Sequence, residues 1–540
     1  MTAESVNPRR GLWAAGIVGF WMLVAAGAVF TGAGIWVRRT FGVISIDQLL
    51  SNINGGGDGA GGDALVAGAV AAILVVPVAI TLALAVVVET FRRGLRSKDW
   101  FTTLRTRLFR GISIALAVVL PLSGAVVFGD TIGAADYVQA SMREKALGTT
   151  LADFYTAPKI ESTTGTGGSA VSVGSRNDES VTATNGAAGT KNLVLIYLES
   201  IEDTFADDTV FEENMLAPVQ EATSGWAAVP RLQQYEGGGW TMAGIVSTQC
   251  GIPLRTASSN ADNNDLNVLG DKGHEVEQFL PGADCLGDVL KQKGYRNVFL
   301  GGANADFAGK GTFLSGHGYD EVDDLKVWAS EGETETRDDW GLSDRRLFER
   351  AKEKVTQLHD AGQPFNLTIL TLDTHEEPHV YDYCDVTTKK AMTSITLCSM
   401  EQVAEFVDFM ENEGYLNDTT VVLMGDHRKM NVEGGSFWDE LKDRDDRTIF
   451  NRVWAPGGAQ FARDEIDQLS MYPTLLELVG LNLKDHRAGI GVSALVKAKD
   501  VPAGSILDLD SSEYLDVVNS RSMDFYAKMW AHGSQVTAAG

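Results

Sequence analysis

Three long runs of apolar residues, with polar segments between them, dominate the first 130 residues. The runs extend roughly over residues 11–37, 64–88 and 111–129, and none of them contains a charged residue. Each run reaches the ~20 residues that a helix needs to cross ~30 Å of hydrocarbon. Transporters usually keep ionisable side chains inside their membrane segments. We therefore predict that residues 1–130 form a three-helix transmembrane anchor.

The polar segments predict how this anchor is oriented. Residues 91–110, between the second and third runs, contain seven basic residues and one acidic residue, and such basic loops stay in the cytoplasm. The N-terminus, with Arg9 and Arg10, then also lies in the cytoplasm. We expect everything after about residue 130 to be extracytoplasmic, with the chain inserted in a bacterial plasma membrane.

Residues 131–190 lack the long apolar runs that precede them. Residues 131–157 fit an amphipathic stretch along the membrane surface, whereas residues 162–190 are rich in Gly, Ser and Thr and have no periodicity. The second composition is typical of a flexible tether. We therefore predict a juxtamembrane segment and flexible linker over 131–190, and a folded extracytoplasmic domain that carries the catalytic residues over 191–540.

In that last part of the chain, short apolar runs alternate with amphipathic segments. The runs predict strands at 192–200, 296–302, 365–375 and 419–427, and the amphipathic segments predict helices at 284–295, 342–359 and 399–413. This alternation predicts an α/β fold, with a mostly parallel sheet flanked by helices. In such sheets, ligands bind outside the carboxyl ends of the strands.

The charge of the chain excludes one class of partner. Acidic residues outnumber basic ones by 72 to 45, which gives a formal net charge of −27. Residues 1–129 instead carry 11 basic and 6 acidic residues, so the acidic excess lies beyond the predicted anchor. A protein that binds duplex nucleic acid needs basic surface. We therefore expect a membrane but no nucleic acid among the partners.

Acidic and imidazole side chains follow the predicted strands. Glu199 ends the first strand, His375 follows the third, and Asp426 with His427 follows the last. Parallel topology would bring them to one edge, where carboxylate and imidazole ligands suit Mn²⁺ or Zn²⁺, and Mg²⁺ if water completes the shell. The alternatives are a cap of the following helix for Glu199, and a turn acid beside a surface histidine for Asp426 and His427.

Thr241 is the candidate nucleophile. It follows glycines 237–239 and Trp240, and an apolar helical pattern begins at this point. A Gly-rich turn that enters a helix directs backbone N–H groups and the positive end of the helix dipole toward an anion. A metal-activated hydroxyl at that position can attack phosphorus. The alternative is that Thr241 only caps the helix.

The chain has four cysteines, Cys250, Cys285, Cys384 and Cys398. An even number in an extracytoplasmic domain predicts disulfides, and order and spacing favour Cys250–Cys285 and Cys384–Cys398 among the three possible pairings. Cys250 is also a rival nucleophile, because residues 250–255 are similar to the Cys-x-Pro-x-Arg pattern of sulfatases. Pro253 and Arg255 each fall one residue too late for that pattern, so we favour the disulfide.

The remaining candidates are basic or imidazole side chains that could contact the phosphate of a substrate. His375 and His379 follow a strand, and a histidine there can bind phosphate oxygens or protonate a leaving alkoxide. Lys310, after a Gly-rich stretch, can neutralise phosphate charge. We expect three further histidines, His274, His317 and His359, in loops or at the surface.

A series of ordered motifs extends over roughly residues 192–500. They are LES (198–200), WTMAGIVSTQCGIPL (240–254), CLGDVLKQKGY (285–295), FAGKG (307–311), SGHGYDEV (315–322), DDWGLSD (338–344), DTH (373–375), GDHRKMN (425–431) and SMYPTLLELVGL (470–481). Together they resemble the alkaline phosphatase/sulfatase superfamily, and within it the phosphoglycerol transferases that modify periplasmic glucans. Lipoteichoic acid synthases are more distant relatives.

This resemblance implies roles for named residues. Thr241 is the nucleophile, and the metal is held by Glu199, Thr241, Asp426 and His427. The metal is one divalent ion, with Mn²⁺ as first choice and Mg²⁺ or Zn²⁺ as alternatives. His375 falls on the histidine that binds substrate phosphate, and Lys310 falls nearest to a basic substrate contact that is an Arg in lipoteichoic acid synthases. The cysteine pairs also look like those of the glucan-modifying branch.

The implied reaction moves phosphoglycerol from phosphatidylglycerol to an envelope polysaccharide or glycolipid through a phospho-threonine intermediate. A phosphoethanolamine transferase or a phosphatase/sulfatase-type hydrolase of the same fold is the alternative enzyme, and a non-catalytic envelope sensor is a further one. The predicted three spans differ from the five of lipoteichoic acid synthases. Residues 255–283 and those after about 500 match no part of the resemblance.

Overall fold

The computed structural model describes residues 8–42, 44, 46, 67–95, 104–135, 138, 142, 148–161, 171–172, 191–255, 278–337 and 340–531. The chain separates into two compact units. The first consists mainly of the N-terminal helices, and the second contains nearly all described residues after residue 142.

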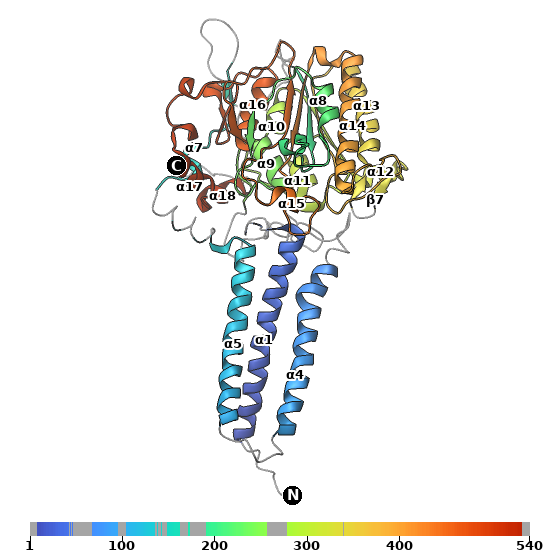
Figure 1. Ribbon diagram of the computed structural model, residues 1–540. Helices are drawn as coiled ribbons and strands as arrows, with labels where there is room; N and C mark the ends of the chain where they lie inside the picture. The colour runs from blue at the N-terminus through green and yellow to red at the C-terminus, as the bar shows by residue number, and fades with distance from the viewer. Residues whose placement is uncertain are drawn as a thin grey trace. The chain divides into compact units, whose positions relative to one another are not determined.

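The N-terminal unit contains three long helical segments (Figure 1). They are α1 (Pro8–Phe41), α4 (Val76–Leu95) with the π-helical turn η1 (Ala71–Val75) before it, and α5 (Leu104–Thr131). Within the described residues, Gly16–Phe41 and Ala67–Thr90 are long and apolar enough to cross a membrane, by length and composition, and α5 contributes a shorter apolar stretch, Leu116–Thr131. The three-helix transmembrane anchor therefore stays a prediction.

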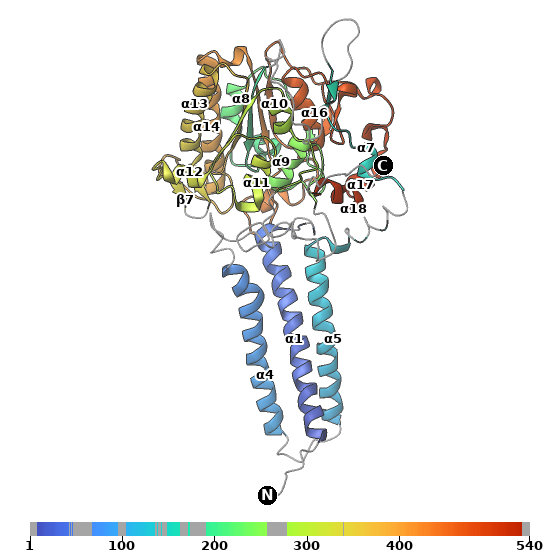
Figure 2. The same ribbon diagram turned by 180° about the vertical axis from the view of Figure 1, so that it is seen from behind.

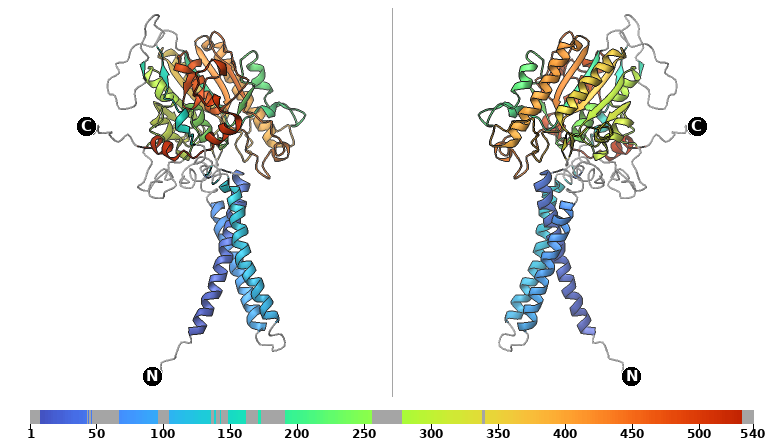
Figure 3. Two further views of the ribbon diagram at one scale, coloured as in Figure 1. Left: turned by 90° about the vertical axis from the view of Figure 1, so that its left-hand side faces the viewer. Right: turned by 90° about the vertical axis from the view of Figure 1, so that its right-hand side faces the viewer.

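Helices α1 and α5 pack closely where they cross and spread apart toward the N-terminal end of α1 (Figure 3). A Cβ atom added at Gly124 of α5 would lie 2.5 Å from the Gly27 carbonyl oxygen of α1, and one at Gly27 would lie 2.7 Å from the backbone of Leu120. Small residues at such crossings let helix backbones approach each other, which is how helices associate in lipid. Gly27 and Gly124 are therefore packing positions between these two helices.

The second unit is built on a six-stranded sheet (Figure 1). Its strands, in spatial order, are β11 (Asn451–Trp454), β10 (Thr419–Gly425), β3 (Asn192–Leu198), β9 (Phe365–Leu370), β5 (Arg296–Gly301) and β6 (Glu321–Asp323). Only β11 runs antiparallel to its neighbour. The prediction of an α/β domain with a mostly parallel sheet is confirmed.

Helices cover both faces of this sheet (Figures 1 and 2). Leu193, Leu195 and Tyr197 of β3 face a core formed with α9 (Thr241–Cys250), α10 (Leu286–Gln292) and α16 (Gln468–Leu478). The alternate residues of β3 face a core formed with α8 (Ala217–Ala222), α13 (Asp344–Asp360) and α14 (Ala391–Asn412). A strand buried on both faces is apolar at every position, which explains the uninterrupted run that predicted β3.

Smaller elements surround this centre. The two-stranded sheets pair β1 (Lys159–Ile160) with β2 (Val171–Ser172), β4 (Arg231–Gln233) with β12 (Glu465–Asp467), β7 (Thr336–Arg337) with β8 (Gly341–Leu342), and β13 (Arg487–Ala488) with β14 (Gly491–Val492). The short helices are α7 (Leu151–Phe154), α11 (Lys310–Gly316), α12 (Leu325–Ser330), α15 (Trp438–Leu441), α17 (Ser511–Val518) and α18 (Met523–Met529). The 3₁₀ turns include η2 (Asp203–Ala206), η5 (Phe307–Gly309), η6 (Tyr415–Asn417), η7 (Lys484–His486), η8 (Ala498–Asp500) and η9 (Ile506–Asp508).

Two predicted elements have different boundaries in the structure. Helix α14 begins at Ala391 rather than 399, and its added turns contain Thr393, Ser394 and Thr396. These residues have low intrinsic helix propensity, but all three are buried, so tertiary packing decides their conformation. Strand β9 ends at Leu370 rather than 375, because residues 371–375 leave the sheet and turn over the strand ends.

The described part of residues 148–161 belongs to the second unit. Leu151 and Phe154 of α7 are buried in its core, and the Thr156 amide donates to the Gly489 carbonyl over 2.7 Å. The expectation of a membrane-surface stretch over 131–157 is therefore wrong for this part, because its apolar side chains cover the fold instead. Of the predicted tether, 162–190, all but residues 171–172 lies outside the described residues.

The segment after residue 500, which the sequence left unassigned, completes the core beside α9. Tyr526 of α18 is fully buried, and its hydroxyl donates to the Pro253 carbonyl over 2.5 Å. Trp530 donates from its indole nitrogen to the Arg255 carbonyl over 2.8 Å. This C-terminal segment therefore holds the chain that leaves the C-terminal end of α9. The middle of the unassigned insert, residues 256–277, lies outside the described residues.

Candidate active site

The parallel strands bring the predicted site residues to one edge of the sheet. Gly425 of β10 lies in register with Leu198 of β3, so Asp426 and Glu199 leave the sheet side by side. The segment after β9 joins them, because the Glu199 amide donates to the Thr371 hydroxyl over 2.9 Å, and the Thr374 hydroxyl donates to the Glu199 carbonyl over 2.5 Å. The strand ends thus form one connected cluster.

Glu199, Asp426 and His427 converge within this cluster. One atom from each lies within 4.8 Å of the others. The His427 Nε2 atom is 3.7 Å from a Glu199 oxygen and 3.6 Å from Asp426 Oδ2, and all three side chains are buried. The other ring nitrogen, Nδ1, faces the Arg428 carbonyl oxygen at 2.7 Å and therefore carries the proton. This leaves the Nε2 lone pair directed at the two carboxylates, which is the arrangement of a metal ligand.

The second oxygen of Asp426 is the strongest evidence for a cation here. Asp426 Oδ1 accepts from the amides of Ser200 and His427, at 2.9 and 2.8 Å, whereas buried Oδ2 has no hydrogen-bond partner. A buried oxygen without a partner is costly. A divalent ion among Oδ2, Glu199 and His427 Nε2 would satisfy it with the carboxylate and imidazole ligands that Mn²⁺ and Zn²⁺ accept. The residues present therefore fit a metal, whose identity they leave open.

The two carboxyl groups of this cluster have opposite pKa shifts. Burial raises the pKa of Asp426 to about 7, and the neighbouring Glu199 adds to this increase. Burial also acts to raise the pKa of Glu199, but His427 and His375 outweigh it and hold this pKa well below its usual range. Because the metal-free pair favours one proton and one negative charge, a cation that binds must displace the proton of Asp426.

Thr241 is the first residue of α9 and reaches this cluster. Its hydroxyl donates to Glu199 Oε2 over 3.3 Å. The helix lies close to the strand end because of Gly244, where an added Cβ would meet the Asp426 carbonyl oxygen at 2.1 Å. Gln468 of α16 donates to the same carbonyl over 2.8 Å. The structure thus places Thr241 with Glu199, Asp426 and His427, as the sequence predicted, and its catalytic and metal-binding roles stay predictions.

His375 and Lys310 lie beside this group. Burial lowers the pKa of His375, Glu199 opposes this, and Lys429 and Arg337 add to the lowering. Burial likewise lowers the pKa of Lys310 to about 8, against the attraction of Glu199, Asp324 and Asp426. These mutual effects with Glu199 place both side chains within electrostatic reach of the cluster. His379, by contrast, packs against Tyr381 with ring centroids 4.5 Å apart.

Both cysteine pairs are disulfides in the structure. Cys250 bonds to Cys285, and Cys384 bonds to Cys398. Cys250 stands at the C-terminal end of α9, ten residues long, whereas Thr241 stands at its start. Cys250 therefore has no thiol with which to act as the nucleophile, which is the outcome that the sequence favoured.

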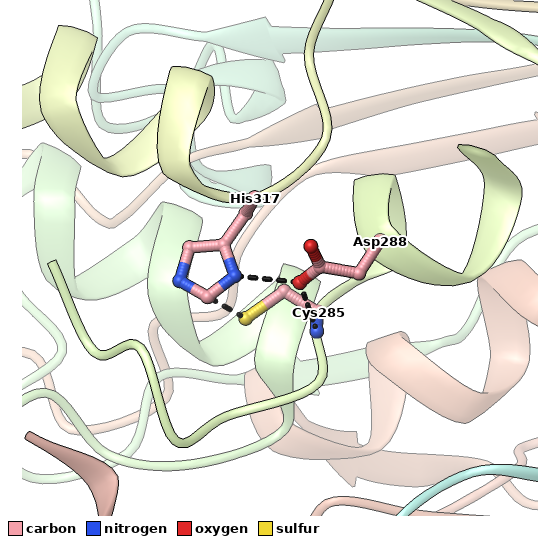
Figure 4. Close-up of side chains that lie close together, drawn as sticks. All are labelled: Cys285, Asp288 and His317. Carbon is pink, nitrogen blue, oxygen red and sulfur yellow. Dashed lines mark hydrogen bonds and ion pairs between the residues drawn. The ribbon is translucent and has the colours of Figure 1, made fainter. Parts of the chain in front are cut away.

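A second group of potential metal ligands lies around the first disulfide (Figure 4). His317 lies in the turn that follows α11, which agrees with the expectation of a loop or surface position, but it is fully buried. Its Nδ1 atom is 2.6 Å from Asp288 Oδ2 and its Nε2 atom is 2.8 Å from the Phe279 carbonyl oxygen. With Cys285 in a disulfide and both ring nitrogens facing acceptors, this group is satisfied internally and serves to hold α10 and α11 together.

Replacing His317 with alanine should destabilise the second unit by about 3 kcal/mol, because the Asp288 carboxylate would lose its buried imidazole partner. Urea or thermal unfolding of the purified chain measures this. His359 is a matched control, since it pairs with Asp418 at 3.3 Å but is 31% exposed; its alanine variant should lose less than about 1 kcal/mol. Equal losses in the two variants would contradict the structural role of His317.

Three residues near His375 escaped the sequence analysis. Arg337, Trp340 and Lys429 all contact the segment that carries His375. The only signal in the sequence was their position in the motifs DDWGLSD and GDHRKMN, or just before the first of these. Nothing in their spacing predicts that they bind the backbone of a distant loop. Of the remaining histidines, His359 lies near the surface as expected, and His274 is outside the described residues.

Fold and site together define the class to which this chain belongs. Residues 191–481 match the family described as Sulfatase. Because this span is more than half of the 540 residues, the chain belongs to the sulfatase family, and the resemblance found in its motifs is confirmed at that level.

Within this family, the chain is similar to proteins named phosphoglycerol transferase I. It is 39% identical over 255 residues to the one from Xanthomonas axonopodis pv. citri (strain 306), across 44% of this chain and 34% of the relative. It is 33% identical over 271 residues to the one from Salmonella paratyphi B (strain ATCC BAA-1250 / SPB7), across 48% of this chain and 33% of the relative. The matches thus cover about a third of the length of these curated relatives.

Among solved structures, the crystal structure of the lipoteichoic acid synthase LtaP from Listeria monocytogenes is similar at 15% identity and a TM-score of 0.48, over 64% of this chain and 93% of that one.

Proposed function

We propose that this chain is a phosphoglycerol transferase that moves phosphoglycerol from phosphatidylglycerol to a hydroxyl of an envelope polysaccharide or glycolipid. The observation that carries the proposal is the Thr241 hydroxyl at the N-terminus of α9, 3.3 Å from a carboxylate of the metal-type cluster. The curated relatives named phosphoglycerol transferase I support the choice of transferred group.

In the first step, the Thr241 oxygen attacks the phosphorus of the donor headgroup. The bond from phosphorus to the diacylglycerol oxygen breaks, and a glycerophosphoryl ester forms on Thr241. As this ester forms, the Thr241 proton moves to Glu199, the carboxylate to which the hydroxyl already donates. A divalent ion held by Glu199, Thr241, Asp426 and His427, Mn²⁺ as first choice, would lower the pKa of a nearby hydroxyl and neutralise phosphoryl charge.

His375 and Lys310 are the other two side chains that we assign to the reaction. Lys310 neutralises the phosphoryl oxygens, and the imidazolium form of His375, with protons on both Nδ1 and Nε2, gives its Nε2 proton to the leaving diacylglycerol oxygen. In the second step an acceptor hydroxyl attacks the phosphorus of the threonyl ester and gives its proton to the same nitrogen. Thr241 leaves and takes its proton back from Glu199, so the enzyme returns to its starting state.

The anchor fits a donor that is a membrane lipid. We propose that residues 1–130 hold the chain in a bacterial plasma membrane, with the N-terminus in the cytoplasm and the catalytic domain outside. The linker of this proposal is confined to residues before 148, because residues 148–161 pack into the second unit. Two N-terminal helices have the length and composition of membrane spans, and an anchored enzyme stays in the bilayer that contains its donor.

The purified full chain should release diacylglycerol from vesicles of phosphatidylglycerol when Mn²⁺ is present, and not from vesicles of phosphatidylethanolamine. Lipid analysis measures the release, and mass spectrometry should find a glycerophosphoryl group on the peptide that contains Thr241. Preference for phosphatidylethanolamine would identify a phosphoethanolamine transferase. Release of free glycerol phosphate at an undiminished rate with oligosaccharide acceptors present would identify a hydrolase.

A further inference from the structure

The segment that carries His375, residues Thr374–Glu377, is held through its backbone rather than its side chains. It lies outside the sheet and the helices, so its carbonyl groups have no partners from regular secondary structure. Backbone carbonyls in such loops usually turn to water. Here all four consecutive carbonyl oxygens accept hydrogen bonds from side chains, and three of the donors come from distant parts of the chain.

Lys429 holds the start of this segment. Its Nζ atom donates to the Thr374 carbonyl over 2.7 Å and pairs with Glu376 Oε1 at 3.2 Å. The lysine follows the end of β10 by four residues, two after His427, and it is buried. Lysines are almost never buried without such partners. Lys429 thus ties the loop after β9 to the loop after β10, which carries Asp426 and His427.

Arg337 and Trp340 hold the other three carbonyl groups of this segment. The Arg337 guanidinium donates to the His375 carbonyl over 3.3 Å and to the Glu377 carbonyl over 2.6 Å, and this arginine is also buried. The Trp340 indole donates to the Glu376 carbonyl over 3.2 Å, and its ring lies against the His375 ring with centroids 3.9 Å apart. The fork of an arginine can bridge two carbonyls in this way, and a lysine cannot.

The consequence for His375 is a fixed ring with one defined nitrogen facing away from the loop. Its Nδ1 atom lies against the Glu376 carbonyl oxygen, which only accepts, so Nδ1 carries a proton. Nε2 is then the nitrogen left for the site. Trp340 restrains the ring from one side, and the Thr374 hydroxyl ties the segment to the Glu199 carbonyl.

From these contacts we propose that Arg337, Trp340 and Lys429 are positioning residues: they clamp the Thr374–Glu377 backbone so that His375 presents Nε2 to the phosphoryl group. The proposal rests on the role assigned to His375 in the proposed function. All three residues act on His375 through the backbone carbonyls of this segment. A misplacement of about 1 Å at a catalytic group can lower a rate by about 100-fold, so two buried cations at this loop have a direct effect on turnover.

A double-mutant cycle tests this proposal. The variant Lys429→Met should lower kcat for diacylglycerol release by about 10- to 100-fold with little change in KM, because the donor binds but the proton is misplaced. In a His375→Ala background, the same change should cost less than about twofold, since its target is already gone. Arg337→Lys should lose less than Arg337→Met, because the charge remains and one of the two carbonyls stays within reach.

Lys390 is the matched control. Its Nζ atom also binds a carbonyl and a carboxylate, those of Ser436 at 2.9 Å and Glu440 at 2.6 Å, but it does not contact the clamped segment. Lys390→Met should leave kcat within about twofold of wild type. An undiminished loss from Lys429→Met in the His375→Ala background would overturn the proposal, because Lys429 would then act independently of His375.

Hydrogen exchange separates this proposal from the proposed function. In Lys429→Met, amide exchange should increase in the peptide that contains Thr374–Glu377 and stay unchanged in α9 and β3. Unchanged exchange in that peptide overturns the clamp whatever the donor is. A wild-type chain that turns over none of the donor lipids would instead contradict the proposed function, and the exchange result would still decide the clamp.

Discussion

Replacing Thr241 with valine should lower the rate of diacylglycerol release by about 10⁴-fold or more, because the variant keeps the shape of the side chain and removes the attacking oxygen. The glycerophosphoryl adduct should also disappear from the peptide that contains residue 241. The purified variant is compared with wild type on phosphatidylglycerol vesicles, by diacylglycerol release and by mass spectrometry.

Two comparisons make this result specific. Thr241→Ser keeps a hydroxyl at the start of α9, so it should keep measurable turnover and the adduct, at a reduced rate because serine rotates more freely. The unfolding midpoint of the valine variant without metal should match that of wild type, since Thr241 is only half-buried and begins the helix. Turnover by Thr241→Val at the serine rate would refute the nucleophile.

Removing the divalent ion should have the second largest effect. A chelator should abolish turnover, and saturation with Mn²⁺ at about 100 times the dissociation constant should stabilise the wild-type chain by about 3 kcal/mol. Asp426→Asn should lose most of both effects, because the buried Oδ2 atom that lacks a hydrogen-bond partner in the structure would no longer be a carboxylate oxygen. Thermal unfolding with and without metal, and titration calorimetry, measure the two quantities.

The pH dependence of this binding has a definite sign. The metal-free pKa of Asp426 is raised to about 7 by burial and by Glu199, so below that pH the ion must displace a proton. Its affinity should fall by up to about tenfold per pH unit between pH 7 and pH 5. In the metal-free chain Asp426 acts in the opposite direction: the folded state keeps a proton that the unfolded state releases, so this group adds stability as the pH falls from 7 toward 4.

A matched control exists for this result too. Glu465 is a carboxylate about half-exposed in its pair with Arg231, and Glu465→Gln should leave Mn²⁺ affinity and its pH dependence as in wild type. Metal affinity that rises as the pH falls, or that survives intact in Asp426→Asn, would show that the ion is held elsewhere.

The sequence predicted the centre of the fold better than its margins. Strands such as β3 and β10 are mostly apolar, because they are buried on both faces, and this signal does not depend on the rest of the chain. The start of α14 was missed, because Thr393, Ser394 and Thr396 favour a helix only once they are packed. The sequence analysis placed most of residues 148–161 along a membrane surface, and it left residues 511–529 unassigned. Both segments were missed because the partners that bury them lie hundreds of residues away.

In the candidate site, too, the sequence predicted some residues and missed others. Glu199, Asp426 and His427 follow strands whose parallel order the sequence already predicted, so their convergence could be expected, and Thr241 was predicted to begin α9. Lys429, Arg337 and Trp340 bind carbonyl groups, and a backbone carbonyl has no sequence signature. His317 lies in a turn, as expected, but its burial was missed, because a lone histidine in a Gly-rich turn has the same sequence pattern whether or not it contacts a buried carboxylate.

The contact between Tyr526 and the carbonyl of Pro253 joins positions separated by 273 residues. Contacts so distant in sequence form late, since the intervening chain must first be made and brought together. The end of the helix that carries Thr241 therefore stays uncovered until nearly the whole of the second unit has been synthesised. In a nascent chain of this protein, Thr241, the proposed nucleophile, therefore sits on a helix whose far end is still uncovered.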